Sequence, residues 1–87
     1  MLIIKADGRK EPFNQRKIIG SLERIGLNQQ SAKEIAQTMR ARYRGAVSSD
    51  EIFHSIIAIL KSQDTALASK YNLRRALMQL GPAGYPF

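Results

Sequence analysis

The sequence predicts a mainly helical α+β domain, in which four helices follow an N-terminal β-hairpin. Three observations support this fold class. Apolar residues recur at helical spacing in four stretches, a side chain suited to helix capping precedes each stretch, and an Asp-Gly dipeptide separates two short β-prone runs at the N-terminus. Because a hairpin alone is marginally stable in water, we expect it to pack on the helices as a movable lid.

The N-terminal hairpin is predicted from residues 2–5 and 10–13, two short runs that favour β structure. Asp7 and Gly8 lie between them and supply the positive φ angles that a tight hairpin turn requires. Pro12 has no backbone N–H to donate, so we expect the second strand at an edge of the sheet.

The first two helices each begin at an asparagine and end at a glycine. Asn14 and Asn28 can accept a hydrogen bond from the first turn of the helix that follows. Gly26 and Gly45 mark the C-terminal ends. The apolar residues at helical spacing are Ile18, Ile19, Leu22 and Ile25 in the first helix and Ala32, Ile35, Ala36, Met39 and Tyr43 in the second.

The third helix has the most apolar pattern of the four. Ser48 and Glu51 form a capping box at its start, and its apolar face is wide enough to be buried on two sides. Asp64 is the predicted cap of the fourth helix, which is expected to end at Gly81 and Pro82. The apolar residues are Ile52, Phe53, Ile56, Ile57 and Leu60 in the third helix and Leu67, Tyr71, Leu73, Ala76, Leu77 and Leu80 in the fourth.

Composition narrows the classes of protein to consider. A chain of 87 residues forms one small domain, which leaves no room for a separate catalytic domain. The absence of cysteine excludes disulfides and thiolate metal sites, and no apolar run is long enough to span a membrane or resembles an export signal. We therefore expect a cytoplasmic domain with no membrane partner. Its net charge of +7 favours phosphate-bearing partners, either nucleotides or nucleic acids.

The residue types that support catalysis or metal binding have simpler explanations here. There is no Walker A run and no Gly-x-Gly-x-x-Gly motif, which excludes P-loop and Rossmann nucleotide sites. His54 is the single histidine and is expected to be a surface or structural residue. Ser48 and Asp50 are accounted for by capping and by the helix dipole. We therefore expect neither a catalytic residue nor a metal site.

The start of the first helix is the strongest candidate for binding phosphate. Its free backbone N–H groups attract anions, Lys17 lies one turn inside it, and Lys5 lies on the strand that approaches it. Glu11 can accept a hydrogen bond from the exocyclic amine of a base. The candidate apolar walls are Ile3, Ile18 and Phe53. By spacing alone, the simpler interpretation is a solvated basic surface made of Lys5, Arg9, Lys10, Arg16 and Lys17.

Residues 3–17, IIKADGRKEPFNQRK, resemble the opening of the ATP-cone. This regulatory nucleotide-binding domain occurs at the N-terminus of ribonucleotide reductase large subunits and in the repressor of their genes. The family opening reads approximately V-x-K-R-D-G-x-x-E-x-F-[DN]-x-x-K-I. The chain matches it at Lys5, Asp7, Gly8, Glu11, Phe13, Asn14, Lys17 and Ile18, with Ile3 in place of valine.

The resemblance implies a site for ATP or dATP, with Mg²⁺ as a candidate companion ion. Glu11 would face the base, whereas Lys5 and Lys17 would face the phosphates. Residues 47–52 are similar to the family's V-[ST]-[ST]-x-x-I, which implies that Ser49 contributes a hydroxyl. The implied site residues are Ile3, Lys5, Glu11, Asn14, Lys17, Ile18, Ser49 and Phe53.

Two positions depart from the family pattern. Ala6 stands where the family commonly has arginine, which removes a phosphate contact, and Phe53 stands where reductase cones can have histidine. Both departures bear on triphosphate affinity and on discrimination among ATP, dATP and ADP.

Residues 67–87 resemble the version of the ATP-cone that is fused to a restriction-endonuclease-like nuclease domain. This resemblance implies an ATP-cone over residues 1–82 and the start of a junction to a C-terminal domain over residues 83–87. The apolar ending fits such a junction, and it also fits a tail packed on its own helices. The domain would then be regulatory and not an enzyme itself, with a nuclease-like partner domain through which DNA is contacted.

Two other functions remain open from the sequence. Arg40, Arg42 and Arg44 cluster at the end of the second helix, and Arg74 and Arg75 adjoin in the fourth, which would suit a nucleic-acid-binding module. Arginines near a helix C-terminus also complement its dipole. The third function is an oligomerisation module, in which the apolar end and a helical face join copies of the chain.

Overall fold

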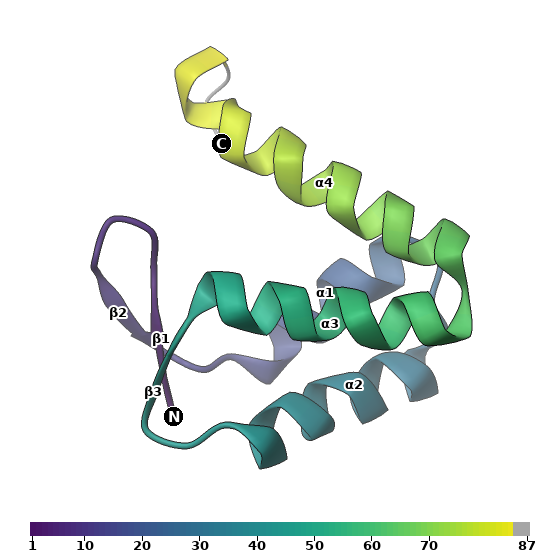
Figure 1. The fold of residues 1–87 in the computed structure, drawn as a ribbon, viewed down its shortest axis with the longest axis horizontal. Coiled ribbons are helices and arrows are strands. Elements are labelled where there is room, and N and C mark those ends of the chain that lie inside the picture. The colour runs from purple at the N-terminus through teal and green to yellow at the C-terminus, as the bar shows by residue number, and fades with distance from the viewer. Residues whose placement is uncertain (85–87) are drawn as a thin grey trace.

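The computed structural model describes the backbone of residues 1–84 and the side chains of residues 1–76. In Figure 1, α3 lies at the centre with α4 above it, α2 below it and α1 behind it, while the hairpin stands at one end. The predicted α+β fold of four helices and an N-terminal hairpin is confirmed. The elements in chain order are β1 (Leu2–Ile4), β2 (Lys10–Pro12), α1 (Gln15–Arg24), α2 (Gln29–Arg42), β3 (Ala46–Ser48), α3 (Ser49–Gln63) and α4 (Thr65–Gly84).

A third strand, which the sequence did not predict, completes a small sheet. The strand order is β2-β1-β3, with β1 antiparallel to β2 and parallel to β3. Ile3 pairs with Glu11 on one side and with Val47 on the other. Pro12 lies on an edge strand, as predicted. The hairpin is therefore tied through β3 to the start of α3, and displacing the whole hairpin as a lid would break the parallel pairing.

The hairpin turn differs from the predicted two-residue turn. Only Gly8 has a positive φ, of 88°, whereas Asp7 does not. The Gly8 N–H donates to the Lys5 carbonyl at 2.9 Å, and the Lys5 N–H donates to the Arg9 carbonyl at 2.7 Å. These bonds close a three-residue loop, which needs one left-handed residue instead of two. Lys5 to Arg9 thus extend beyond the paired strands.

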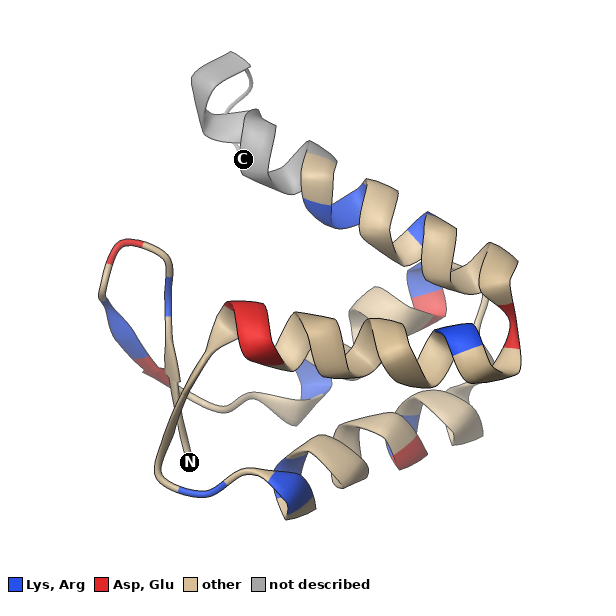
Figure 2. Ribbon diagram, in the orientation of Figure 1, with Lys and Arg blue, Asp and Glu red and all other residues tan. Residues whose placement is uncertain are grey.

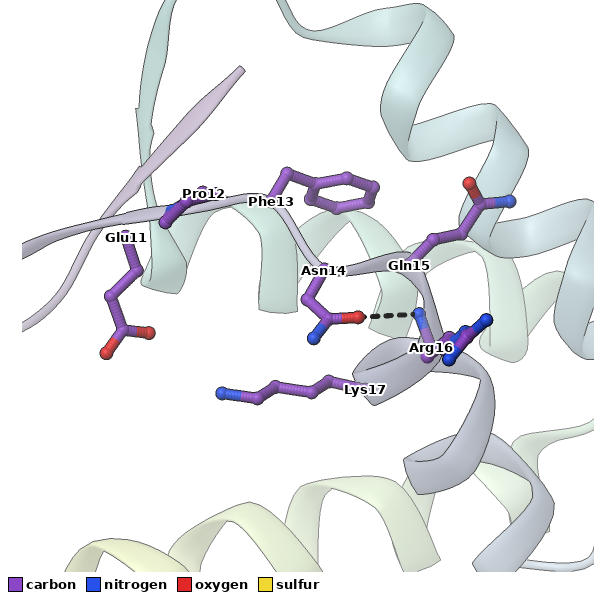
Figure 3. Close-up of a pocket in the computed structure, with 7 residues that line it drawn as sticks. All are labelled: Glu11, Pro12, Phe13, Asn14, Gln15, Arg16 and Lys17. Atoms are coloured by element: carbon purple, nitrogen blue, oxygen red, sulfur yellow. Dashed lines mark hydrogen bonds between the residues drawn. The ribbon is translucent and has the colours of Figure 1, made fainter.

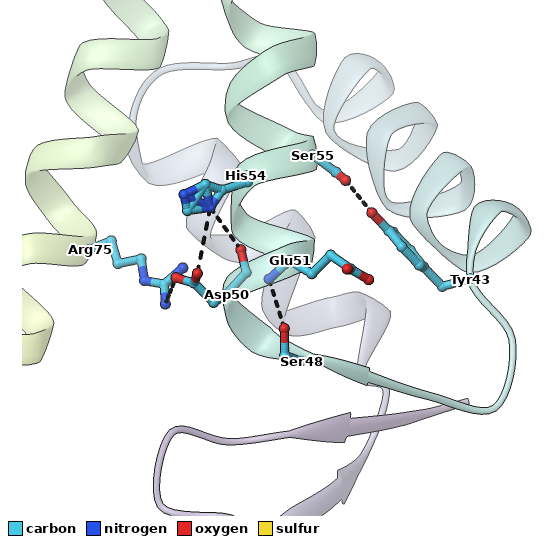
Figure 4. Close-up of polar contacts among 7 residues, drawn as sticks. All are labelled: Tyr43, Ser48, Asp50, Glu51, His54, Ser55 and Arg75. Atoms are coloured by element: carbon cyan, nitrogen blue, oxygen red, sulfur yellow. Dashed lines mark hydrogen bonds and ion pairs between the residues drawn. The ribbon is translucent and has the colours of Figure 1, made fainter.

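The predicted helix caps are confirmed. Asn14 accepts from the Arg16 N–H at 3.0 Å, Asn28 from the Ser31 N–H at 2.8 Å, Ser48 from the Glu51 N–H at 3.1 Å and Asp64 from the Ala66 N–H at 2.9 Å. Each cap satisfies one of the N–H groups that the first helical turn leaves without a partner. Figure 4 shows the cap at the start of α3.

The core forms around α3, which packs against α2, α4 and β3. Leu22 of α1, Met39 of α2 and Leu60 of α3 are fully buried. A hydrogen bond between the hydroxyls of Tyr43 and Ser55 joins the end of α2 to α3 (Figure 4). The buried apolar residues are Leu22, Ile25, Leu27, Ala32, Ile35, Ala36, Met39, Val47, Ile52, Ile56, Leu60 and Ala68.

The fourth helix departs from the sequence prediction in two ways. Its backbone does not end at Gly81 and Pro82 but continues to Gly84. Pro82 lies in the last turn and has no N–H to donate to the carbonyl four residues earlier, so the helix continues there with one backbone hydrogen bond fewer. Leu73, predicted on the apolar face, is 62% exposed because the described part of α4 packs extensively on α3 alone. Residues 85–87 of the predicted junction lie outside the described residues.

Two glycine substitutions should have opposite effects on stability. Gly26 has a φ of 102° between α1 and α2, so Gly26→Ala should lower the free energy of unfolding by about 1–2 kcal/mol. Gly20 lies inside α1, and a Cβ added there meets no atom within 4 Å. Gly20→Ala should therefore raise the free energy of unfolding by about 0.5–1 kcal/mol. Urea denaturation followed by circular dichroism measures both. Equal changes in the free energy of unfolding for the two variants would contradict the conclusion that the backbone at Gly26 disfavours alanine.

Candidate functional site

One cavity brings together residues from β1, β2, α1, α3 and α4. It has a volume of about 540 Å³, and its lining residues come from the hairpin, the start of α1, α3 and α4. Every site residue expected from the sequence lines it: Ile3, Lys5, Glu11, Asn14, Lys17, Ile18, Ser49 and Phe53. The hairpin carries three of these residues and α3 carries two. Separate parts of the chain therefore converge on one site.

The start of α1 forms one wall of this cavity. The Asn14 side chain caps the helix, and the first turn contains no acidic residue that would neutralise the N-terminal end of the helix dipole. Figure 3 shows Glu11, Asn14 and Lys17 on one side of this segment, with Phe13 and Gln15 on the other. A basic side chain and a positive helix end thus face the same space.

The hairpin contributes two carboxylates, both already ion-paired. Glu11 lies 3.8 Å from the Lys5 amine and 3.9 Å from the Arg9 guanidinium. Asp7 lies 2.6 Å from Arg9 and also accepts from its backbone N–H at 3.0 Å. This backbone hydrogen bond, with the Arg9 side chain, lowers the pKa of Asp7. At neutral pH the hairpin therefore offers charges that are largely matched within it.

The fourth helix supplies three cavity residues that sequence reasoning did not assign to the site. They are Tyr71, Arg74 and Arg75. The Nε atom of Arg74 is buried and has no hydrogen-bond partner among the described residues. Residues three and four apart share a helix face, so this spacing was a signal in the sequence. The spacing alone did not reveal that this face of α4 would line a cavity together with the hairpin.

Phe53 connects α3 to these α4 residues. Its ring stacks on Tyr71 with the centroids 5.6 Å apart and the planes at 17°, and the Arg75 guanidinium carbon lies 4.1 Å from the Phe53 centroid. Burial raises the pKa of Tyr71, partly offset by the Ser21 hydroxyl and the charges of Arg75 and Arg74. The Tyr71 hydroxyl therefore stays protonated at neutral pH and can donate a hydrogen bond.

Asp50 holds Arg75 at the rim of the cavity. The Asp50 carboxylate lies 3.1 Å from an Arg75 nitrogen, and the nearby His54 ring nitrogen lies 3.7 Å from the same carboxylate (Figure 4). Arg75 is largely buried, with 21% of its side chain exposed, whereas Asp50 is 67% exposed. His54 is a surface residue, as predicted, and its Nδ1 also contacts the Asp50 carbonyl at 3.1 Å.

The electrostatics of the cavity suit a polyanion. Five basic side chains line it, against the two carboxylates of the hairpin. Neither Lys17 nor Arg74 has a carboxylate within ion-pair distance among the described residues. The described part of the chain contains no group of three or more acidic or histidine residues that could hold a metal ion.

Two other surfaces are weaker candidates. A recess of about 470 Å³ is lined by residues 11–17 alone, so a single short segment forms it. Arg40 and Arg42 lie in the last turn of α2, and Arg74 and Arg75 lie in α4. Basic residues are coloured blue in Figure 2, where α2 and α4 lie on opposite sides of α3. The two arginine groups therefore do not form one continuous basic face.

The chain is similar to a known family of domains along most of its length. A family model described as "ATP cone domain" matches residues 1–79, which is most of the chain. No curated protein matches the chain significantly. Within the described residues, no helix combines the length and apolarity needed to cross a membrane.

Proposed function

The chain belongs to the ATP-cone family, and on this basis we propose that its main cavity binds ATP or dATP and that occupancy regulates a partner domain. ATP-cone domains are generally regulatory nucleotide-binding modules, not catalytic ones. The observation that carries the proposal is the convergence of all eight expected site residues on one cavity with an excess of basic side chains. Residues of a merely solvated basic surface would have no reason to line one cavity from the hairpin, α1 and α3 together.

The charges in the cavity suggest how the nucleotide lies. Lys17 and the start of α1 would hold phosphates, because this is where a basic side chain without a carboxylate partner meets a positive helix end. Arg74 would supply a further contact, since a phosphate oxygen would satisfy its buried Nε. The side chain of Lys5 would turn from Glu11 towards the phosphates.

The base would lie on the apolar side of the same cavity. Ile3 and Ile18 supply apolar walls, and Glu11 accepts a hydrogen bond from the exocyclic amine of adenine. Guanine presents a carbonyl oxygen at the equivalent position, which would face the carboxylate unfavourably. Phe53 supports the site through Tyr71 and Arg75. Where Mg²⁺ accompanies the nucleotide, the phosphates would hold it, because Asp7 is paired with Arg9 and Glu11 faces the base.

The regulated partner is proposed to be a nuclease-like domain that follows this domain in the cytoplasm. This part of the proposal rests on the resemblance of residues 67–87 to the nuclease-fused version of the ATP-cone. Residues 1–82 would form the sensor and residues 83–87 would begin the junction. DNA would be contacted through the partner, and association between copies of the chain would accompany regulation.

A nucleic-acid-binding module without a nucleotide site is the competing function. Its support is the cluster of Arg40, Arg42 and Arg44. Arg40 and Arg42 lie in the last turn of α2, where they complement the helix dipole without any nucleic acid. A steep salt dependence of DNA binding by this domain would favour the competing function.

Adenine nucleotides should stabilise the purified domain against heat. ATP or dATP at 100 times its dissociation constant should add about 2.7 kcal/mol of stability, which corresponds to a shift on the order of 10 °C for a domain of this size. Thermal unfolding with ATP, dATP, ADP and GTP, each with and without Mg²⁺, measures this. A shift with ATP or dATP and none with GTP supports the proposal. No shift with any nucleotide would contradict it.

A further inference from the structure

The fourth helix is attached to the rest of the domain along one side. Among the described residues it packs extensively on α3 alone, and Ala68 of α4 is buried in the core. Near the cavity, Arg75 contacts Phe53 and Asp50, and Tyr71 stacks on Phe53. Figure 1 shows α4 and the hairpin projecting from the helical body with α3 between their bases. Residues of both elements line the cavity. A molecule that fills the cavity must therefore contact the two projecting elements together.

Arg75 contacts the Asp50 carboxylate and the Phe53 ring, and it also lines the cavity. The Arg75 guanidinium pairs with Asp50 at 3.1 Å. Asp50 is two-thirds exposed, so water can solvate its carboxylate when the pair opens. The adjacent Arg74 carries a buried Nε with no partner among the described residues. Arg74 thus gives α4 a donor that has no acceptor among the described residues, on a residue that lines the cavity.

We propose that the Arg75–Asp50 ion pair is a latch that nucleotide phosphates open. The phosphates replace Asp50 as the acceptor for Arg75 and satisfy Arg74 at the same time, and α4 moves towards the hairpin. Because Asp50 and the phosphates compete for one guanidinium, nucleotide binding and the latched position of α4 exclude each other. This inference rests on the proposed function and adds the element that moves and the contact that resists the movement.

If Asp50 competes with the phosphates for Arg75, then removing the Asp50 charge should strengthen ATP binding. Asp50→Asn removes the competitor, so ATP should bind about two- to five-fold more tightly, as measured by isothermal titration calorimetry. Glu51→Gln is the matched control. It removes one carboxylate from the same first turn of α3, but Glu51 does not contact Arg75. This control should bind ATP as the unmodified domain does, which separates the latch from a general change in charge.

A double-substitution cycle identifies Arg75 as the residue that responds. In an Arg75→Gln background, Asp50→Asn should leave ATP affinity unchanged, because no guanidinium remains to be released. An unchanged or weaker affinity for Asp50→Asn alone would overturn the latch, and a weaker one would mean that Asp50 orients Arg75 for the phosphates. Failure of the unmodified domain to bind ATP would instead overturn the proposed function, so the two failures are distinguishable.

The movement of α4 can be measured directly. The chain contains no cysteine, so spin labels can be placed on Lys10→Cys of β2 and Asn72→Cys of α4, both exposed positions outside the cavity. Saturating ATP should shorten the distance between the labels and narrow its distribution in electron double resonance. Asp50→Asn should shift the distribution in the same direction before ATP is added. An unchanged distance at saturating ATP would overturn the movement.

Discussion

Replacing Lys17 with alanine should weaken ATP binding by about 10- to 100-fold while the helix content stays unchanged. A hydrogen bond to a charged group contributes about 1.5–3 kcal/mol, and the lysine side chain has no carboxylate within ion-pair distance in the described structure. Lys17 is exposed, so the fold does not depend on its side chain. Isothermal titration calorimetry measures the affinity, and far-ultraviolet circular dichroism measures the helix content.

The matched control for this result is Lys33→Ala. Lys33 is exposed on α2 and does not line the cavity, but its removal changes the net charge by the same amount. ATP affinity should stay within about two-fold of the unmodified value, because separated surface charges are screened by salt. Equal losses in both variants would mean that overall charge, and not the start of α1, attracts the nucleotide.

Leu60→Ala should lower the free energy of unfolding by about 2–5 kcal/mol. Leu60 is fully buried in α3, at the centre of the helices, so its removal leaves a cavity that the neighbouring helices cannot easily fill. A single domain usually has only 5–15 kcal/mol of stability in total. The variant should therefore be close to unfolding at moderate temperature. Urea denaturation followed by circular dichroism measures the change.

Leu73→Ala provides the comparison for the core substitution. The same side chain is lost, but Leu73 is 62% exposed on α4. Its substitution should change the free energy of unfolding by no more than about 0.5 kcal/mol. A large loss for Leu73→Ala would mean that this face of α4 is covered in solution, as an association between copies would produce.

The third strand changes how the hairpin can take part in regulation. A free hairpin could open and close as one rigid lid, but β1 is paired on both of its edges. Only the turn from Lys5 to Arg9 extends beyond the paired strands. The described part of α4 packs extensively on α3 alone, and its movement would break no strand pairing. The proposed latch therefore places the movement in α4.

The helices and their boundaries were predictable because the signals are local. Asn14, Asn28, Ser48 and Asp64 each cap the helix that follows them, through bonds to residues two or three positions away. The third strand was not predictable in this way. Residues 46–48 are too few to show an alternating pattern, and their partner is β1, more than 40 residues earlier in the chain. Such pairing depends on the packed position of α2.

For the cavity, the sequence by itself determined the residues of the hairpin and of the start of α1, because they occur together in one short motif. It also determined the charge that favours a polyanion. Only the tertiary structure decided that Tyr71, Arg74 and Arg75 line the same cavity, and that Asp50 pairs with Arg75. A helical pattern fixes which residues share a face, but the packing of that helix on its neighbours decides what the face meets.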